Sequence, residues 1–170
     1  MVKKENQLIT KGIEVGHIFY FGDKYSKSMN CSVDSKDGKK IFVKMGSYGI
    51  GVSRLVAAII EAKFSNEKMK WPREVSPFDV VIIPVINKND NSNVEKAKIL
   101  YKSLIEKGID VLFDDIDENI SNKFKKHDLI GIPYQIIVGS KTTKDKFEFK
   151  EVGKESQVLE INKIINLLKK

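Results

Sequence analysis

The chain has 170 residues, a net charge of +7 and a single cysteine. One cysteine excludes an intramolecular disulfide framework, and no apolar run approaches the roughly 18 residues that a membrane-spanning helix needs. These properties favour a soluble, cytoplasmic protein with one sizeable core or two small ones. Nearly all the excess positive charge lies in residues 1–75, so charge alone does not identify a nucleic-acid partner.

The first part of the chain predicts strands within residues 12–22 and 39–51, separated by a polar stretch that contains the turn "DSKDGKK". A helix is expected over residues 52–63, where apolar residues recur at helical spacing. Two or three strands and one helix make a thin fold, so this part is expected to be the end of a larger domain.

Two prolines within six residues, in "WPREVSP", break regular structure and suit a linker. They place a domain boundary between residues 75 and 76. The first domain is therefore expected to span residues 1–75 and the second residues 76–170.

The second domain alternates apolar strand patterns with amphipathic helix patterns. This alternation predicts a small α/β layer with a largely parallel sheet. The expected strands span residues 78–86, 109–115 and 132–139, with an edge strand over 146–152, and the expected helices span 93–108, 120–130 and 158–170.

The segment "GSYGIGVSR" places Gly49 and Gly51 at the end of a strand and Arg54 in the first turn of the following helix. Glycines let a ligand approach the backbone, and a helix N-terminus favours anions, as does an arginine fork. The alternative is a tight turn with Arg54 in solvent. The chain has 28 lysines but only two arginines, which suggests that Arg54 does what lysine cannot.

Other catalytic chemistry has little support in the sequence. Two histidines, one cysteine and no paired ligand spacing predict neither a metal site nor a catalytic triad. Asp114 and Asp115 are adjacent, and adjacent strand residues point to opposite faces, so a site shared by both carboxylates is not expected.

Five blocks occur in an order and spacing that resemble the prolyl-tRNA synthetases of the bacterial type, a likeness that runs from Gly12 to the end of the chain. The resemblance implies an α/β protein in which residues 1–75 are the last part of the antiparallel catalytic sheet of a class II synthetase, with its third signature motif. Residues 76–170 would be an α/β anticodon-binding domain with a mixed, largely parallel sheet. The blocks are "GIEVGHIFYFGDKYSKSMN", "MGSYGIGVSR", "WPREVSPFDVVIIPV", "GIDVLFDD" and "DLIGIPYQIIVG".

Within the catalytic part, the resemblance makes Arg54 the catalytic arginine that contacts ATP, with Gly49 and Gly51 beneath the nucleotide. It places His17 and Ser47 in the proline pocket. From the residues alone, His17 could equally be a satisfied core histidine, and Ser47 could be bonded locally.

Within the second domain, the relatives often carry "DDRxERxGxKF", whereas this chain reads "DDIDENISNKF". Ile116 and Asn119 thus replace arginines, and Ser121 replaces glycine. The lysines of this block could either bind RNA or simply form the solvent-exposed face of a helix. The residues that match, and that the resemblance assigns to anticodon binding, are Asp114, Asp115, Lys123 and Phe124.

The resemblance implies a parent enzyme, expected to be a homodimer, that activates proline with ATP and Mg²⁺ and transfers it to tRNA(Pro). No tightly bound cofactor, metal site, membrane or DNA is expected. Nothing in the chain resembles motifs 1 and 2, so the chain is expected to be a C-terminal fragment that is inactive alone. Two alternatives remain: a non-catalytic RNA-binding or subunit-docking module, and a synthetase of another specificity.

Overall fold

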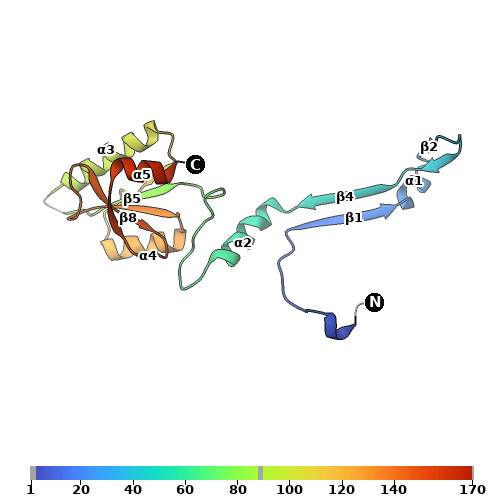
Figure 1. Ribbon diagram of the computed structural model, residues 1–170, viewed down its shortest axis with the longest axis horizontal. Helices are drawn as coiled ribbons and strands as arrows, with labels where there is room; N and C mark the ends of the chain where they lie inside the picture. The colour runs from blue at the N-terminus through green and yellow to red at the C-terminus, as the bar shows by residue number, and fades with distance from the viewer. Residues whose placement is uncertain (1–2, 88–89, 170) are drawn as a thin grey trace. The chain divides into compact units, whose positions relative to one another are not determined.

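The computed structural model describes residues 3–87 and 90–169. Their contacts divide the chain into two compact units, which we call the N-terminal unit (residues 1–59) and the C-terminal unit (residues 60–170). The first elements in chain order are η1 (Lys4–Asn6), β1 (Gly16–Gly22), α1 (Lys24–Ser28), β2 (Ser32–Asp34), β3 (Lys40–Phe42), β4 (Met45–Ile50) and α2 (Val52–Lys63) (Figure 1).

The N-terminal unit contains two antiparallel strand pairs, β1 with β4 and β2 with β3. The turn between β2 and β3 contains Gly38 at φ +73°, a left-handed conformation that glycine adopts without strain. Of the two expected strands, the first begins later, at Gly16, and the second is divided into β3 and β4. The structure adds α1 and β2 within the polar stretch that separates the two expected strands.

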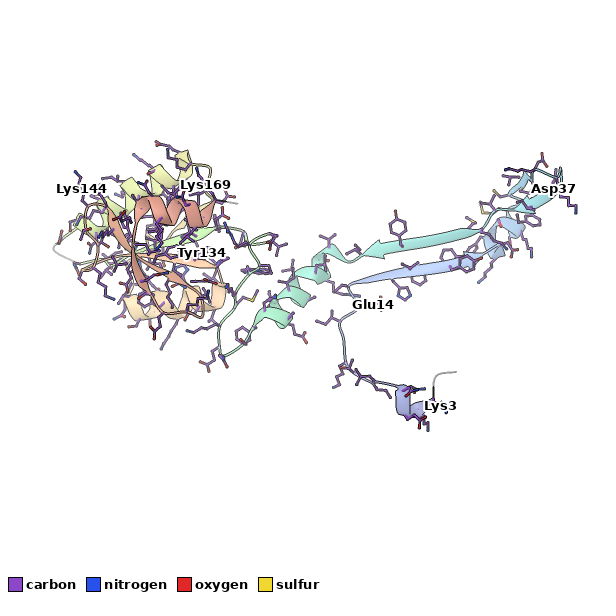
Figure 2. All side chains as sticks on the ribbon, viewed as in Figure 1. Lys3, Glu14, Asp37, Tyr134, Lys144 and Lys169 are labelled. Carbon is purple, nitrogen blue, oxygen red and sulfur yellow. The ribbon has the colours of Figure 1, made fainter. Side chains whose placement is uncertain are left out.

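The side chains of the N-terminal unit stand largely in solvent, as those of β1 and β4 do in Figure 2. Ile18 is 82% exposed and Tyr48 is 86% exposed, and no apolar side chain among residues 3–59 is buried. Helix α2 forms as expected, but Val52 and Val56 on its apolar face are exposed as well. The described part of this unit thus has no hydrophobic core of its own.

The C-terminal unit is built on a five-stranded sheet in the order β6-β5-β7-β8-β9. β6, β5 and β7 are parallel, whereas β8 and β9 are antiparallel to their neighbours. Its elements are β5 (Val80–Pro84), α3 (Ser92–Glu106), β6 (Val111–Phe113), α4 (Ile120–Ile130), β7 (Tyr134–Val138), β8 (Lys146–Glu151), β9 (Gln157–Glu160) and α5 (Ile161–Leu168).

Helices cover both faces of this sheet. Side chains of α3 and α5 join the larger of two apolar clusters, whereas Ile120 and Phe124 of α4 pack with the smaller cluster on the opposite face (Figure 1). Within β5, Ile82 belongs to the first cluster and Ile83 to the second. This double burial explains why the strand reads as a continuous apolar run.

Two sequence-based expectations for the C-terminal unit are wrong. Residues 158–160 belong to β9 rather than to the last helix, and β8 is therefore an inner strand and not an edge strand. Leu159 is buried between two more exposed neighbours, an alternation that is too short to distinguish from the start of an amphipathic helix.

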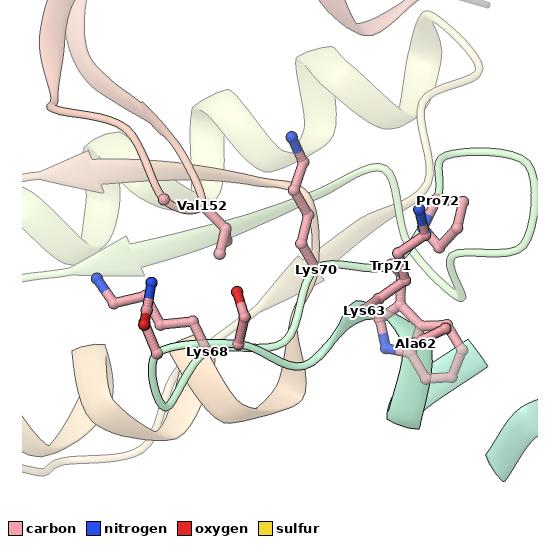
Figure 3. A pocket seen from close by; sticks show the side chains of 10 residues that line it. Ala62, Lys63, Lys68, Lys70, Trp71, Pro72 and Val152 are labelled. Atoms are coloured by element: carbon pink, nitrogen blue, oxygen red, sulfur yellow. The ribbon is translucent and has the colours of Figure 1, made fainter. Parts of the chain in front are cut away.

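The expected linker, residues 71–77, lies within a segment of the C-terminal unit, residues 64–78, that is bonded to helix α4. The backbone N–H of Met69 donates to Asp128 O over 2.8 Å, and the indole Nε1–H of Trp71 donates to Ile130 O over 2.9 Å. A hollow of about 560 Å³ lies beside this segment, and Figure 3 shows Lys70 among the side chains that line it. Contacts therefore divide the chain ahead of the boundary expected from the prolines.

Candidate functional site

All five residues that the sequence assigned to the catalytic part line one shallow pocket of about 370 Å³ in the N-terminal unit. The pairing of β1 with β4 brings them together, because His17 lies opposite Gly49 and Phe19 lies opposite Ser47. Directly opposed residues of an antiparallel pair share one face of the sheet. The predicted residues in this pocket are His17, Ser47, Gly49, Gly51 and Arg54.

The two predicted glycines of the pocket, Gly49 and Gly51, are not required by a strained turn, since neither has a positive φ. A Cβ atom at Gly49 would meet nothing within 4 Å, and a Cβ at Gly51 would lie 3.3 Å from the Cβ of Arg54. Protein packing thus leaves Gly49 open, and the missing side chain keeps the strand backbone accessible from the pocket.

Arg54 lies in the first turn of α2 and is held by the segment that precedes β1. Its Nη1 donates to the backbone oxygen of Glu14 over 2.9 Å and lies 3.9 Å from Glu14 Oε1. The side chain remains 58% exposed, so much of the guanidinium is accessible. The arginine is anchored at one side and open at the other.

Glu14 is a pocket residue that the sequence did not single out. Its Oε1 lies 3.4 Å from Nδ1 of His17, and it also contacts Arg54. The three-residue spacing from Glu14 to His17 carries no signal by itself. Glu14 becomes a partner of Arg54 through the pairing of β1 with β4. Next to this pairing, Gly51 N donates to Val15 O, so the start of α2 lies beside residues 14 and 15.

His17 is not a core histidine. Its side chain is 50% exposed, and its ring stacks on Phe19 with centroids 4.1 Å apart. Ser47 is also exposed, on the same face. Both side chains are therefore accessible from the pocket.

In the C-terminal unit, the buried carboxylate of Asp114 collects several donors from α4. Its Oδ2 lies 2.6 Å from His127 Nε2 and 3.0 Å from Lys126 Nζ. Nζ of Lys123 donates to the backbone oxygen of Asp114 over 3.0 Å and lies 3.5 Å from its Oδ1. We call these four residues the Asp114 cluster.

Charge and burial act against each other in this cluster. Burial alone would raise the pKa of Asp114, but the hydrogen bonds from His127 and Lys126 and the charge of Lys123 outweigh it and lower that pKa. Burial also lowers the pKa of His127, more than the bond to Asp114 raises it. At neutral pH, His127 is therefore uncharged, with its Nε2–H donating to the Asp114 carboxylate.

The four residues assigned to anticodon binding fall into two pairs. The side chains of Lys123 and Asp114 are only 1% and 2% exposed, so neither offers surface to RNA in this conformation, and Lys123 does not lie on a solvated helix face. Asp115 is exposed, and Phe124 lines a hollow of about 460 Å³ in which Lys150 Nζ lies 5.9 Å from the centre of its ring.

Two further properties concern ligands and membranes. Among residues 3–87 and 90–169, no group of three or more His, Cys, Asp and Glu side chains could hold a metal ion. No helix within the same ranges is long and apolar enough to cross a bilayer.

Family comparisons agree with this division of the chain. Residues 79–170, more than half of the chain, match the family described as anticodon binding domain. The chain belongs to the anticodon-binding domain family. Residues 4–63 match a second family, described as the tRNA synthetase class II core domain (G, H, P, S and T).

Individual relatives confirm the resemblance to prolyl-tRNA synthetases. The chain is 59% identical to the proline–tRNA ligase of Pelagibacter ubique over 98% of its own length and 38% of that protein. It is 48% identical to the proline–tRNA ligase of a Wolbachia of Brugia malayi, over 97% of the chain and 39% of the relative. The chain thus spans about two fifths of these relatives.

A solved structure, Giardia lamblia prolyl-tRNA synthetase in complex with prolyl-adenylate, resembles this chain with a TM-score of 0.72 at 23% identity. The match covers 89% of this chain and 32% of that protein. It confirms the expected fold class, with a small antiparallel sheet followed by a mixed α/β sheet.

Proposed function

We propose that this chain is the motif 3 and anticodon-binding part of a cytoplasmic, homodimeric proline–tRNA ligase, which activates proline with ATP and transfers it to tRNA(Pro). The observation that carries the proposal is the convergence of His17, Ser47, Gly49, Gly51 and Arg54 on one pocket of the strand pair that matches the class II core. The sequences of the relatives, which are proline–tRNA ligases, support the same specificity.

The proposed first reaction forms prolyl-adenylate. A carboxylate oxygen of proline attacks the α-phosphorus of ATP, the bond to the β-phosphate oxygen breaks, and pyrophosphate leaves. Positioning and stabilisation of charge on the phosphoryl oxygens promote such a transfer more than a side-chain base does. The accessible guanidinium of Arg54 suits this role, and Gly49 leaves room for the nucleotide above the strand.

Magnesium enters this proposal with ATP as part of the substrate. Glu14 is the one carboxylate among the residues that line the described pocket, and Mg²⁺ is commonly held by one or two carboxylates together with substrate phosphates. Glu14 already contacts Arg54 and His17, so we assign it to holding those side chains.

The proposed RNA surface lies where β5 and β6 end. Helix α3, which follows β5, and helix α4, which follows β6, cover opposite faces of the sheet, and such a switch point opens a crevice at the carboxyl ends of the strands. Asp115 is exposed there, and its carboxylate can accept hydrogen bonds from the edge of an unstacked guanine. A separate hollow, lined by Phe124 and Lys150, offers an aromatic ring with a cation 5.9 Å from its centre.

A chimeric enzyme tests the proposal. This chain would replace the matching part of the Pelagibacter ubique ligase, and proline-dependent ATP–pyrophosphate exchange and charging of tRNA(Pro) would be measured. We expect both activities with proline and neither with alanine or threonine. A well-folded chimera that activates another amino acid, or that exchanges without charging tRNA(Pro), would contradict the assignment.

A further inference from the structure

The Asp114 cluster places three ionisable side chains of one helix face around a single carboxylate. Lys123 and His127 are both almost fully buried, with side chains 1% and 2% exposed. Lys126 is partly exposed and also lies 3.7 Å from Glu118 Oε2. The cluster thus joins α4 to the end of β6 by charge-assisted contacts rather than by apolar packing.

Such a cluster contributes little net stability to a fold, because its charged groups must be desolvated. Removing a lysine and a carboxylate from water costs several kcal/mol each, and apolar side chains of similar size often stabilise equally well or better. In the described part of the chain, Nδ1 of His127 is buried without a hydrogen-bond partner, which adds to the cost. Hydrogen bonds and ion pairs are directional, so they can fix a single backbone conformation, which apolar packing does less well.

The backbone that they fix is the loop between β6 and α4, residues 114–119. Asp114 N donates to Ile82 O over 3.0 Å, and Asp114 Oδ1 accepts from Ile116 N over 3.3 Å. At the other end, the side chain of Asn119 caps α4 by accepting from Ser121 N over 2.8 Å. Between these two anchors, the exposed residues of the loop include Asp115 and Ile116.

We propose that Lys123 and His127 are positioning residues, which hold Asp114 and thereby fix loop 114–119 in the conformation that presents Asp115 to an RNA base. This inference rests on the proposed function of the domain. It gives Lys123 a role different from the RNA contact that the sequence resemblance implies. A buried ammonium that donates to the Asp114 backbone acts on the RNA only through the loop.

The test uses the 170-residue chain and two RNA hairpins, the anticodon stem-loop of a proline tRNA and the same hairpin with the two shared anticodon guanines replaced. Dissociation constants are measured at several salt concentrations for the chain, for Lys123→Met and for Lys125→Met. Lys125 is exposed on the same helix, so its variant loses the same charge without touching Asp114. It is the matched control.

For Lys123→Met we expect the preference for the guanine hairpin, on the order of tenfold or more in the chain, to fall by about fivefold or more. The slope of log affinity against log salt should stay unchanged, because no phosphate contact is lost. Lys125→Met should keep the preference. Equal weakening of both hairpins by Lys123→Met, with the salt slope reduced by about 0.7, would overturn the proposal in favour of a phosphate contact.

A second measurement separates failure of this inference from failure of the proposed function. Hydrogen exchange of the amides of residues 115–119 should be faster in Lys123→Met and in His127→Ala than in Lys125→Met, with or without RNA. His127→Gln, which retains a donor near the position of Nε2, should restore slow exchange. If the chain shows no preference between the hairpins, anticodon reading fails; if loop exchange is the same in all variants, positioning fails.

Discussion

The two arginines of this lysine-rich chain each donate a guanidinium N–H to a backbone carbonyl. Arg54 donates to Glu14 O, and Arg73 donates to Leu168 O over 2.7 Å at the end of α5. The guanidinium of Arg73 also lies 5.6 Å from the centre of the Tyr134 ring. A planar fork with several donors can anchor a backbone and still face a ring or a ligand, which a single ammonium does less well.

Arg54→Ala in the chimeric ligase should slow proline-dependent ATP–pyrophosphate exchange by roughly a hundredfold or more, the scale of losing one preorganised charge contact. Arg54→Lys should restore part of the rate, because it keeps the charge but not the fork. The control is Lys63→Ala, at the other end of α2. Exchange that is unchanged in Arg54→Ala would remove Arg54 from the catalytic site.

The pKa shifts of the Asp114 cluster predict acid sensitivity of the C-terminal unit. His127 has a lowered pKa when folded, so below about pH 6.5 the unfolded chain binds a proton that the folded chain resists. Asp114 has a lowered pKa as well, and the stability that its ionised carboxylate gives the folded unit is lost as the pH falls through that lowered value. Protonation of His127 and protonation of Asp114 both favour the unfolded chain. The free energy of unfolding should therefore decrease continuously from about pH 6.5 downward.

Urea unfolding followed by the fluorescence of Trp71, the single tryptophan, measures this dependence between about pH 2.5 and pH 8, a range that includes the titration of Asp114. In His127→Gln, the decline that begins near pH 6.5 should be absent, while the part due to Asp114 remains. A His127→Gln profile that coincides with that of the unchanged chain would show that His127 does not resist protonation in the folded unit.

The structure brings the residues predicted for the catalytic part together in one pocket. Arg54 stood out in the sequence because arginine is rare in this chain, and the family resemblance assigned Gly49 and Arg54, although their spacing alone also allowed a tight turn with Arg54 in solvent. Lys123 was misleading, since a lysine in an amphipathic helix normally lies in solvent. Its burial depends on the carboxylate of Asp114, nine residues away in sequence, and no local pattern reports that partner.

At the scale of elements, apolar runs predicted β5 and β7, and amphipathic helix patterns predicted α3 and α4, all within a few residues. Short elements were missed. β9 has four residues and exists because β8 offers it a partner edge, and α1 has five residues between two turns. Elements of this length are determined by tertiary contacts rather than by their own periodicity.

One turn between elements shows how closely the segment 64–78 is packed. Gly131 ends α4 at φ +81°, and a Cβ atom there would lie 2.5 Å from Cγ of the buried Met69. Gly131→Ala should therefore destabilise the C-terminal unit by about 2–5 kcal/mol, from backbone strain plus overpacking. Gly153 provides the matched control, because it has φ +84° and a Cβ atom added there would meet nothing within 4 Å.

Gly153→Ala should cost only the backbone strain, about 1–2 kcal/mol. Chemical unfolding of both variants at pH 7.5 gives the comparison. Equal destabilisation by the two substitutions would mean that Met69 yields without cost, and that the packing of segment 64–78 contributes little to the stability of the unit.

At the scale of the whole molecule, the two units differ in how they bury apolar surface. Every buried apolar side chain of the described residues lies between Met69 and Leu168. The N-terminal unit instead exposes Ile18, Tyr20 and Tyr48 on a two-stranded ribbon, and such ribbons are marginally stable in water. The number of elements expected from the sequence already indicated this difference, since two or three strands and a helix do not enclose a core.

The chain should accordingly show two levels of protection in hydrogen exchange. Amides of β5, β7 and β8 lie in a sheet covered on both faces and should exchange slowly, whereas those of β1 and β4 should exchange faster by several orders of magnitude, or be protected only where two copies pair through exposed strand edges. Mass spectrometry of the exchanged chain, combined with light scattering to establish the oligomeric state, gives the comparison.

In the chimeric ligase, where further parts of the core domain are available to cover the ribbon, β1 and β4 should gain protection while the C-terminal unit stays unchanged. A monomeric chain in which both units exchange equally slowly would contradict this expectation, because the N-terminal unit would then be stable without the buried surface that stability requires.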